Sequence, residues 1–410
     1  MKRIVVVGGS IAALTAAESL RAEGFDGPLT VLSDEPHQPY SRVPLSKGVL
    51  AGREPADSAM LPPPGEDIEF RTGARAAQLD VRERAVRLTD GTQVPYDGLV
   101  VATGARARRL TGRDDLALRT LDDAQVLASR LAVARSAIVL GGGFLGMEIA
   151  TTCRALGLDV TVVDLVPPLL RLLGPWLADL AVAAARDHGI RVRVAPDGVA
   201  VLGEHRVRCG ELVLEADVIV CAVGDVPNTD WLKGSGLPLD AGGGLVADAC
   251  CRVTPGVVAA GDVVSREGRR TPHWTNAVEQ GRAAAVGLLH GASARPCRPD
   301  PYFWTEQSGL DIKISGELPL TGIPEVLAGS VNDRSALLRW RNDGGTTTAV
   351  AVNHRLPVIK LKRLGAGVPA ARTPGIAPSS DPPPDSSTSR LTTDALRSGS
   401  AGPADHLSSR

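Results

Sequence analysis

Residues 141–146, Gly-Gly-Gly-Phe-Leu-Gly, form a complete G-x-G-x-x-G motif, the arrangement that holds the pyrophosphate of a dinucleotide. Gly141 allows a tight turn, Gly143 lets the backbone approach the pyrophosphate, and Gly146 lets a helix pack closely on its strand. Asp164 follows eighteen residues after Gly146, where an acid accepts ribose hydroxyls and repels a 2′-phosphate. The motif predicts a nicotinamide dinucleotide site that prefers NAD(H) to NADP(H), the alternative being a glycine turn of another α/β fold.

A weaker copy of the motif lies near the N-terminus, where residues 8–13 are Gly-Gly-Ser-Ile-Ala-Ala. Ser10 and Ala13 stand at the second and third glycine positions, and both are small. We therefore predict a second dinucleotide site, with Gly8 and Ala12 among its contacts. Two dinucleotides on one chain indicate an oxidoreductase in which a flavin and a nicotinamide exchange electrons.

Both motifs lie within the same order of elements, so we expect two similar nucleotide-binding units. Each copy has an apolar strand typical of a parallel sheet buried on both faces, a glycine cluster, a helix of small residues and a second strand ending at an acid. A hairpin and a closing buried strand follow. The expected ranges are 4–7, 12–22, 29–32, 85–95 and 98–104 in the first copy, and 137–140, 147–156, 160–163, 205–214 and 217–224 in the second.

The pattern changes near Tyr302, from which short alternating strands run to about Leu364 and predict a small mixed domain. Turns are expected at Asn332 and at residues 342–345. Beyond Gly365 the chain is rich in Pro, Ser and Thr and cannot bury enough apolar surface to offset its ordering entropy. We expect this tail to be disordered.

Composition excludes several classes of protein. The 410 residues suggest two to four domains, and a net charge of −1 favours neither nucleic acid nor an anionic membrane as a partner. The six cysteines have no C-x-x-C spacing, which disfavours zinc sites, iron–sulfur clusters and a dithiol pair, so no metal site is expected. No apolar run has the length of a signal peptide core or a membrane span, and we expect a cytoplasmic protein.

A further candidate group is Asp262, which follows Gly261 at the end of a predicted strand, where its carboxylate can bind the hydroxyls of a ribityl chain. With the two glycine motifs, this residue completes a pattern that resembles the FAD-dependent NAD(P)H:ferredoxin reductases of oxygenase systems. That group includes the putidaredoxin and biphenyl dioxygenase reductases and belongs to the glutathione-reductase structural class. The matching segments run from Lys2 to about Leu364 and include residues 33–47, 102–105, 118–124, 224–229, 260–262, 274–281, 302–307 and 352–354.

The resemblance implies an α/β fold of two Rossmann-like dinucleotide-binding domains plus a small α+β C-terminal interface domain. The FAD-binding domain is expected at residues 1–110 and 238–300, the NAD-binding domain at 111–237, the interface domain at 301–365 and the disordered tail at 366–410.

The resemblance also implies roles for individual residues. Asp34 is expected to bind the adenosine ribose of FAD, Arg119 to contact the flavin nucleotide, and Asp262 to hold its ribityl or pyrophosphate part. Arg42 and Lys47 are expected along the cofactor. The expected cofactor-binding set is Gly8, Ala12, Asp34, Arg42, Lys47, Ala76, Arg119, Gly141, Gly143, Phe144, Gly146, Glu148, Asp164, Gly224, Asp262 and Trp274.

Lys47 and Trp274 are the expected catalytic residues. A fixed cation at Lys47 stabilises the negative charge of a reduced flavin, and a helix beginning at Trp274 points its dipole at the ring. The alternatives are an exposed lysine and a core tryptophan. Phe144 resembles the aromatic residue that covers the flavin, and Glu148 is placed to orient the nicotinamide. Core packing and a solvated helix-face carboxylate are their respective alternatives.

Residues 1–152 contain no cysteine, which excludes the thiol relay of disulfide reductases. The resemblance then implies hydride transfer from NADH to FAD and single-electron delivery to an iron–sulfur ferredoxin that serves an oxygenase or cytochrome P450. Candidate docking cations are Arg106, Arg108, Arg109 and Arg113, unless they are only a solvated loop. The alternatives are a flavoenzyme acting directly on a small organic substrate and an NADH-sensing flavoprotein like apoptosis-inducing factor. A monomer or a homodimer is expected.

Overall fold

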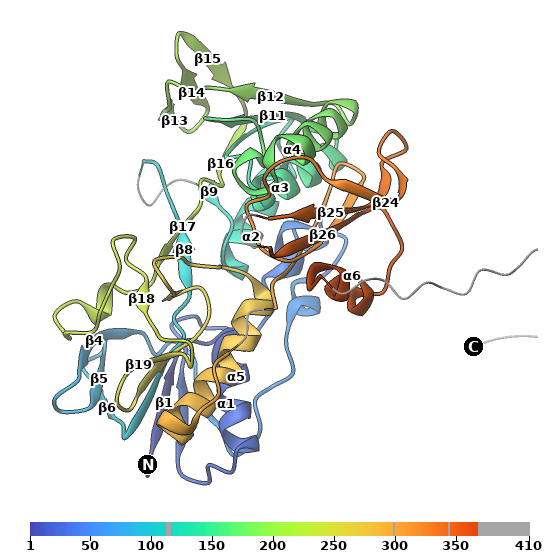
Figure 1. The fold of residues 1–410 in the computed structure, drawn as a ribbon. Coiled ribbons are helices and arrows are strands. Elements are labelled where there is room, and N and C mark those ends of the chain that lie inside the picture. The colour runs from blue at the N-terminus through green and yellow to red at the C-terminus, as the bar shows by residue number, and fades with distance from the viewer. Residues whose placement is uncertain (112–115, 298–299, 343–344, 368–410) are drawn as a thin grey trace, which may run out of the picture. The chain divides into compact units, whose positions relative to one another are not determined.

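A computed structural model describes residues 1–111, 116–297, 300–342 and 345–367 (Figure 1). The predicted disordered tail lies, from residue 368 onward, outside the described residues. The first glycine motif follows the central strand of a six-stranded sheet in the order β19-β20-β7-β1-β2-β3. These strands are β1 (Ile4–Val7), β2 (Leu29–Leu32), β3 (Glu69–Arg71), β7 (Gly98–Val101), β19 (Arg252–Thr254) and β20 (Val257–Ala259).

Strand β1 pairs in parallel with β2 and β7, and every residue of the three strands is buried. Helices α1 (Ile11–Ala22) and α5 (Trp274–His290) share one core with this sheet. The two helices can pack closely because residue 281 is glycine, since a Cβ there would lie only 2.8 Å from the Ala12 carbonyl oxygen. The other face packs against the antiparallel strands β4 (Ala76–Asp80), β5 (Ala85–Leu88) and β6 (Gln93–Pro95). Both faces are covered, as the continuous apolar pattern predicts.

The second glycine motif follows the central strand of a parallel sheet in the order β12-β11-β10-β16-β9. Its strands are β9 (Leu116–Ala117), β10 (Ser136–Leu140), β11 (Asp159–Asp164), β12 (Ile190–Val194) and β16 (Val218–Cys221). Helices α2 (Leu121–Leu131), α3 (Phe144–Ala155) and α4 (Leu170–Asp187) pack on one face, and β13 (Val199–Gly203), β14 (Arg206–Cys209) and β15 (Leu212–Glu215) on the other. The predicted repeat of elements is confirmed.

The start of helix α3 differs from its prediction at Met147. The helix begins at Phe144, with Gly143 as its N-cap, so Gly146 lies inside the first turn. A Cβ at position 146 would lie 1.9 Å from the carbonyl oxygen of Gly141. Glycine is therefore present here for close helix–strand packing, as the motif predicts. The predicted start was three residues late because residues 144–146 were counted with the glycine cluster, whereas they form the first turn of the helix.

Two short strands connect the sheets. The chain leaves the first sheet after β7 through β8 (Ala105–Ala107) and leaves the second after β16 through β17 (Asp225–Pro227). The two strands pair antiparallel, with Ala107 opposite Asp225 and Ala105 opposite Pro227. We call this pair the connecting ribbon (Figure 1). Since β19 and β20 rejoin the first sheet, that sheet is built from two separate parts of the chain.

A third, antiparallel sheet follows in the order β22-β23-β26-β25-β24. Its strands are β22 (Tyr302–Gln307), β23 (Leu310–Ser315), β24 (Glu325–Ser330), β25 (Ser335–Arg341) and β26 (Thr347–Val352), and α6 (Val358–Gly365) packs on it. The remaining elements are β18 (Leu245–Val246), β21 (Val264–Ser265) and the 3-10 turns η1 (Val43–Ser46), η2 (Ala56–Ala59), η3 (Asp230–Leu232) and η4 (Gly291–Ser293). The expected fold class is confirmed, whereas the domain boundaries at 110, 237, 300 and 365 stay predictions.

Candidate functional site

A cavity of about 510 Å³ opens where the first glycine motif meets helices α3 and α5. A second cavity of about 400 Å³ shares part of its wall with the first, including Gly8 and Asp34. The predicted residues lining the first cavity are Gly8, Ala12, Asp34, Arg42, Lys47, Arg119, Phe144, Glu148, Asp262 and Trp274, and Ala76 lines the second. Eleven of the sixteen predicted contacts thus line two adjoining cavities, which we call the hollow.

The start of helix α1 forms one wall of this hollow. Gly8 has a φ of +128°, and a Cβ there would lie 2.1 Å from the Ala102 carbonyl oxygen, so the turn requires glycine. Ser10 is the N-cap, but its hydroxyl makes no capping bond and instead accepts a hydrogen bond of 2.6 Å from Arg42 Nη1. The first-turn N–H groups have no partner within the helix, and together with Arg42 they form an anion-binding corner.

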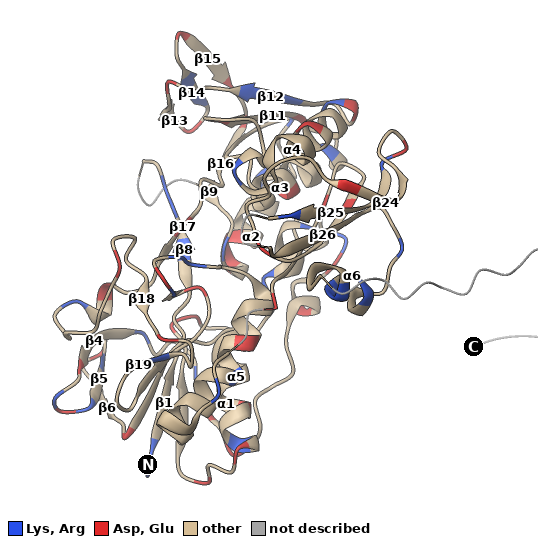
Figure 2. Ribbon diagram, viewed as in Figure 1, with Lys and Arg blue, Asp and Glu red and all other residues tan. Residues whose placement is uncertain are grey.

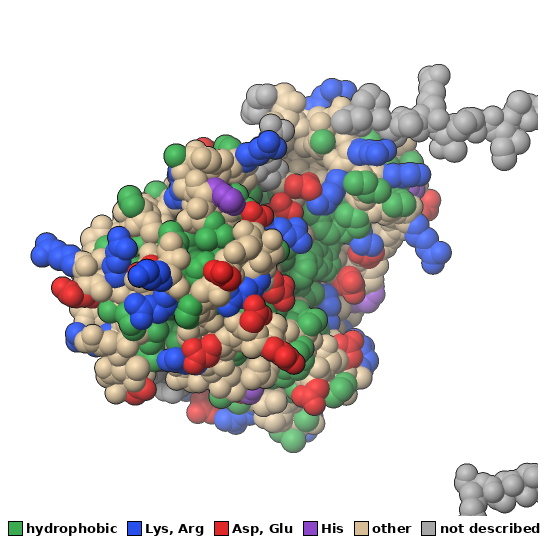
Figure 3. All heavy atoms as spheres, turned by 90° about the horizontal axis from the view of Figure 1, so that it is seen from below, with side chains coloured by type: hydrophobic (Ala, Val, Ile, Leu, Met, Phe, Trp, Pro, Cys, Tyr) green, Lys and Arg blue, Asp and Glu red, His purple; other side chains and the backbone are tan. Residues whose placement is uncertain are grey.

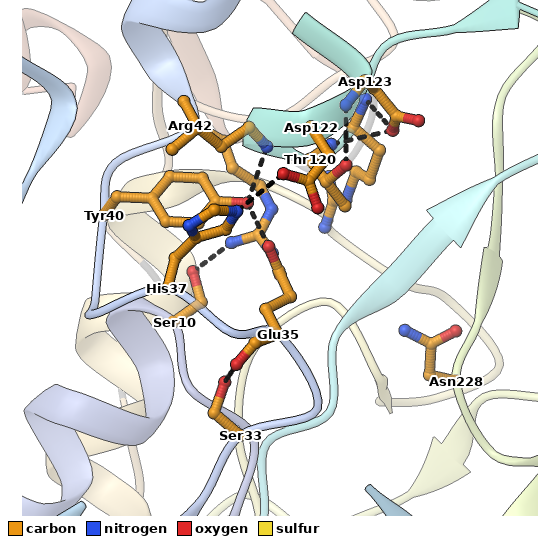
Figure 4. Close-up of polar contacts among 12 residues, drawn as sticks. Ser10, Ser33, Glu35, His37, Tyr40, Arg42, Thr120, Asp122, Asp123 and Asn228 are labelled. Atoms are coloured by element: carbon orange, nitrogen blue, oxygen red, sulfur yellow. Dashed lines mark hydrogen bonds and ion pairs between the residues drawn. The ribbon is translucent and has the colours of Figure 1, made fainter. Parts of the chain in front are cut away.

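Arg42 is held by residues that the sequence analysis did not single out (Figure 4). The Glu35 carboxylate accepts hydrogen bonds from the Tyr40 hydroxyl and from Arg42 Nη2, and the guanidinium lies 5.0 Å from the centre of the Tyr40 ring. Burial raises the pKa of Tyr40, so its phenol remains neutral and donates. His37 Nε2 lies 2.7 Å from Asp122 Oδ1 and joins the same segment to α2. The sequence offered one signal for Glu35, namely that it is a second acid directly after Asp34.

Lys47 and Glu148 form an ion pair beside the cavity, with Lys47 Nζ 2.9 Å from Glu148 Oε2. Glu148 is 8% exposed, and its carboxylate also accepts hydrogen bonds from Ser46 Oγ at 2.6 Å and Thr305 Oγ1 at 2.8 Å. The solvated-carboxylate alternative is therefore wrong for Glu148. The Lys47 side chain is 22% exposed, so this is not an exposed lysine either. Ser46 and Thr305 lie 102 and 157 residues from Glu148 in the sequence. No local sequence pattern could therefore identify them as its partners.

The N-terminus of α5 brings aromatic side chains to the same cavity. Trp274 is 36% exposed, which excludes the core-tryptophan alternative. His273 is the N-cap and lies among aromatic rings, with centroids 4.5 Å from Phe303 and 5.2 Å from Trp304. Burial lowers the pKa of His273 to about 4, so its ring is neutral at physiological pH. Phe144 lines the cavity and also packs against the core, so the core-packing alternative applies in part, and its role as a cover for the flavin stays a prediction.

Asp262 lies between two arginines. Its Oδ2 accepts a hydrogen bond of 2.6 Å from Arg119 Nη2, and its carbonyl oxygen accepts one of 3.0 Å from Arg270 Nη1. Burial alone would lower the pKa of Arg119, but the adjacent Asp262 carboxylate, with smaller contributions from Asp225 and Tyr40, raises that pKa. Arg119 also donates to the Ala105 carbonyl oxygen at 2.8 Å. The Asp262 carboxylate is thus fixed at the cavity wall.

The five remaining predicted residues, Gly141, Gly143, Gly146, Asp164 and Gly224, do not line either cavity. Gly141 has a φ of +104°, and Gly143 has no atom within 4 Å of where its Cβ would lie, so a ligand can approach the backbone there. The Asp164 carboxylate accepts hydrogen bonds of 2.6 Å from both the Gly142 and Leu165 amides. This nucleotide loop meets the first cavity through α3, whose Phe144 and Glu148 line it.

Arginines 106–109 are largely engaged within the chain. Arg106 pairs with Asp230 at 3.0 Å, Arg109 with Asp123 at 3.6 Å, and Arg108 donates to the Asp225 carbonyl oxygen at 3.2 Å. Arg113 lies outside the described residues. Acidic and basic residues are interspersed along the chain as drawn in Figure 2 and on the face shown in Figure 3.

The cysteines are free thiols, and burial raises the pKa values of Cys153 and Cys251 to about 12. Within the described ranges, no group of three or more His, Cys, Asp or Glu side chains is placed to hold a metal ion. No helix among the described residues has the length and apolar character that a membrane crossing needs.

Comparison with known proteins agrees with this geometry. The chlorobenzene dioxygenase ferredoxin reductase component of Cupriavidus sp. is 34% identical over 380 residues, covering 85% of this chain and 89% of the relative. The biphenyl dioxygenase ferredoxin–NAD(+) reductase component of Paraburkholderia xenovorans is 33% identical over 368 residues, covering 85% and 90%.

Among solved structures, the covalent putidaredoxin reductase–putidaredoxin complex is similar, with a TM-score of 0.80, 27% identity and coverage of 89% of this chain and 93% of that one. Residues 2–281 match the sequence family described as pyridine nucleotide-disulphide oxidoreductase. Since that match spans both glycine motifs and the relatives cover most of the chain, the protein belongs to the pyridine nucleotide-disulphide oxidoreductase family.

Proposed function

We propose that this protein is an FAD-dependent oxidoreductase that takes electrons from NADH and passes them to an iron–sulfur ferredoxin. The observation that carries the proposal is the meeting of two dinucleotide sites at one helix. Helix α3 begins at the second glycine motif, and its Phe144 and Glu148 line the cavity of the first. Relatives named as ferredoxin reductase components support the same activity.

The residues around the hollow fit FAD. The two adjoining cavities, of about 510 and 400 Å³, share Gly8 and Asp34 and so offer an extended space. One part offers the anion-binding corner of Ser10 and Arg42, and another offers Lys47 and the exposed face of Trp274. Bound FAD would accept a hydride and release its two electrons singly.

Each part of the chain then has a defined task. The α1 N-terminus and Arg42 bind the pyrophosphate, and Asp34 and Ala76 hold the adenosine end. Lys47 places a positive charge beside the flavin ring, with Glu148 fixing the ammonium. The start of α5 directs its positive end and Trp274 toward the ring.

The second glycine motif binds NADH in this proposal. Gly143 allows the pyrophosphate to approach, and Gly224, with a φ of +98° and no atom near its Cβ position, lines the same loop region. Each Asp164 oxygen accepts one backbone hydrogen bond and retains a lone pair for a ribose hydroxyl. Its charge disfavours the 2′-phosphate of NADPH. Phe144 covers the flavin until the nicotinamide displaces it.

The ferredoxin partner rests on the relatives' names and on the absence of any cysteine before Cys153, since electrons must leave without a thiol relay. Docking of an acidic partner would use local cations, because the net charge is only −1. The ion pairs of Arg106 and Arg109 make them weaker docking candidates than isolated cations. A cytoplasmic location and a monomeric or homodimeric state remain part of the proposal.

The test uses the purified full-length protein. We expect a yellow flavoprotein that NADH reduces faster than NADPH does, and that reduces cytochrome c rapidly only when a ferredoxin from the same organism is added. That stimulation should weaken steeply with rising salt. Full turnover with a small organic acceptor would instead indicate direct action on a substrate. A long-lived reduced complex with NADH-dependent association would indicate a sensor. A colourless protein that does not take up FAD would refute the proposal.

A further inference from the structure

The connecting ribbon carries the backbone from the first sheet to the second, because β8 follows β7 and β17 follows β16. The angle of this ribbon therefore sets where the second glycine motif lies relative to the cavity. Hydride transfer requires the two reacting rings to be about 3–3.5 Å apart, and a misplacement of about 1 Å costs on the order of 100-fold in rate. Contacts that fix the ribbon bear directly on the reaction.

Each ribbon strand is tied to the same residue of the cavity wall. In β8, the Ala105 carbonyl oxygen accepts a hydrogen bond from Arg119, whose other nitrogen binds the Asp262 carboxylate. In β17, the Asp225 carboxylate pairs with Arg270, whose other nitrogen binds the Asp262 carbonyl oxygen. Two arginines thus connect Asp262 to the two strands, one through its side chain and one through its backbone.

The Arg270–Asp225 contact is sheltered from water. The side chains of Arg270 and Asp225 are 18% and 20% exposed, so bulk solvent screens their attraction less than it screens an exposed pair. Arg270 lies in the loop that leads into α5, and Asp225 lies in the ribbon, so the contact joins segments 45 residues apart. A planar guanidinium that binds two acceptors at once also restrains direction, which an ammonium does less well.

We propose that Arg270 is a positioning residue for hydride transfer, which, through Asp225 and the Asp262 carbonyl, holds the connecting ribbon at the angle that brings the nicotinamide site to the flavin. This inference rests on the proposed function. Arg270 touches neither bound nucleotide in this role and acts through Asp225 and Asp262.

The experiment measures anaerobic flavin reduction by NADH in a stopped-flow instrument, and FAD affinity by titration of the apoprotein. The variants are Arg270→Gln, Asp225→Asn, the double variant and Arg270→Lys. Arg252→Gln is the matched control, because Arg252 lies in β19, outside the connecting ribbon, and forms an ion pair with Asp248 whose two side chains are 37% and 42% exposed. We expect Arg270→Gln to slow the limiting reduction rate by about tenfold or more, while FAD affinity stays within about twofold. Asp225→Asn should behave alike, and the double variant should be no slower than the worse single variant.

Arg270→Lys should recover part of the rate, since it retains the charge, and the control should match the parent. A parent-like reduction rate in Arg270→Gln and Asp225→Asn would overturn the inference. So would slower reduction that is accounted for by loss of FAD. It would also be overturned if the effects of the two single variants on the rate added fully in the double variant. If Arg270→Gln fails to fold, Asp225→Asn and Arg270→Lys decide by the same criteria. Dithionite reduces the flavin independently of NADH. If dithionite bleaches the flavin of the parent protein but NADH does not, the proposed function is refuted. That result differs from variants that reduce at the parent rate, which would refute only the role of Arg270.

Discussion

Replacing Glu148 by glutamine tests the buried ion pair beside the cavity. The change keeps the shape of the side chain but removes the charge that holds Lys47 at 2.9 Å. Breaking a buried pair costs about 3–5 kcal/mol, and we expect the lower end, about 3 kcal/mol, because Lys47 can turn to water. The Lys47 side chain is already 22% exposed. No cavity is created, so the packing term is small.

A loss of about 3 kcal/mol lowers the folded-to-unfolded ratio about 150-fold and the Tm by roughly 4 °C for a chain of this size. Calorimetry of the FAD-loaded protein measures the shift. Glu18→Gln is the control, since Glu18 is an exposed carboxylate of helix α1 whose change should stay within about 0.5 kcal/mol. A Glu148→Gln protein that melts with the control would refute the reasoning that this pair is buried and coupled.

The same variant has a second readout in the flavin. Without its counter-charge, Lys47 adds more positive potential at the ring, so Glu148→Gln should make the flavin easier to reduce. Lys47→Met should act in the opposite direction and lower the midpoint potential. Spectroelectrochemical titration measures both. Shifts of the same sign in the two variants would show that Lys47 does not act through its charge.

Three further predictions follow from single residues. Gly146→Ala should weaken NADH binding and lower stability, because its Cβ would lie 1.9 Å from the Gly141 carbonyl oxygen, and NADH titration and thermal melting together check this. Because the pKa of His273 is lowered to about 4 from 6.5, stability should be unaffected above pH 6.5 and fall as pH drops toward 4, by about 2 kcal/mol at pH 5. Denaturation midpoints at pH 7.5 and 5 measure this loss, which His273→Asn should reduce. Asp164→Asn should raise the KM for NADH and reduce discrimination against NADPH by about tenfold, because the charge facing the 2′-phosphate is lost. An unchanged ratio of kcat/KM values for the two coenzymes would contradict that role.

The local elements were predictable because their signals are local. A β-branched run followed at once by glycines and small residues specifies strand, turn and helix within about twenty positions, and both copies fold this way. Gly8 and Gly141 could be assigned to tight turns for the same reason, and both have positive φ. The packing role of Gly146 was also predictable, but the start of α3 was misplaced because the last three residues of the glycine motif are at the same time the first turn of the helix.

The partners of the charged groups required the tertiary structure. Nothing local to Glu148 indicates that Ser46 and Thr305, from segments 102 and 157 residues away, satisfy its carboxylate. Likewise, Asp225 and Arg270 meet only because the chain leaves one sheet and returns to it through the ribbon. The sequence by itself determined the two nucleotide-binding motifs, because backbone conformation depends on neighbouring residues. Only the tertiary structure decided which charges pair, because burial and distance between remote segments set the strength of an electrostatic contact.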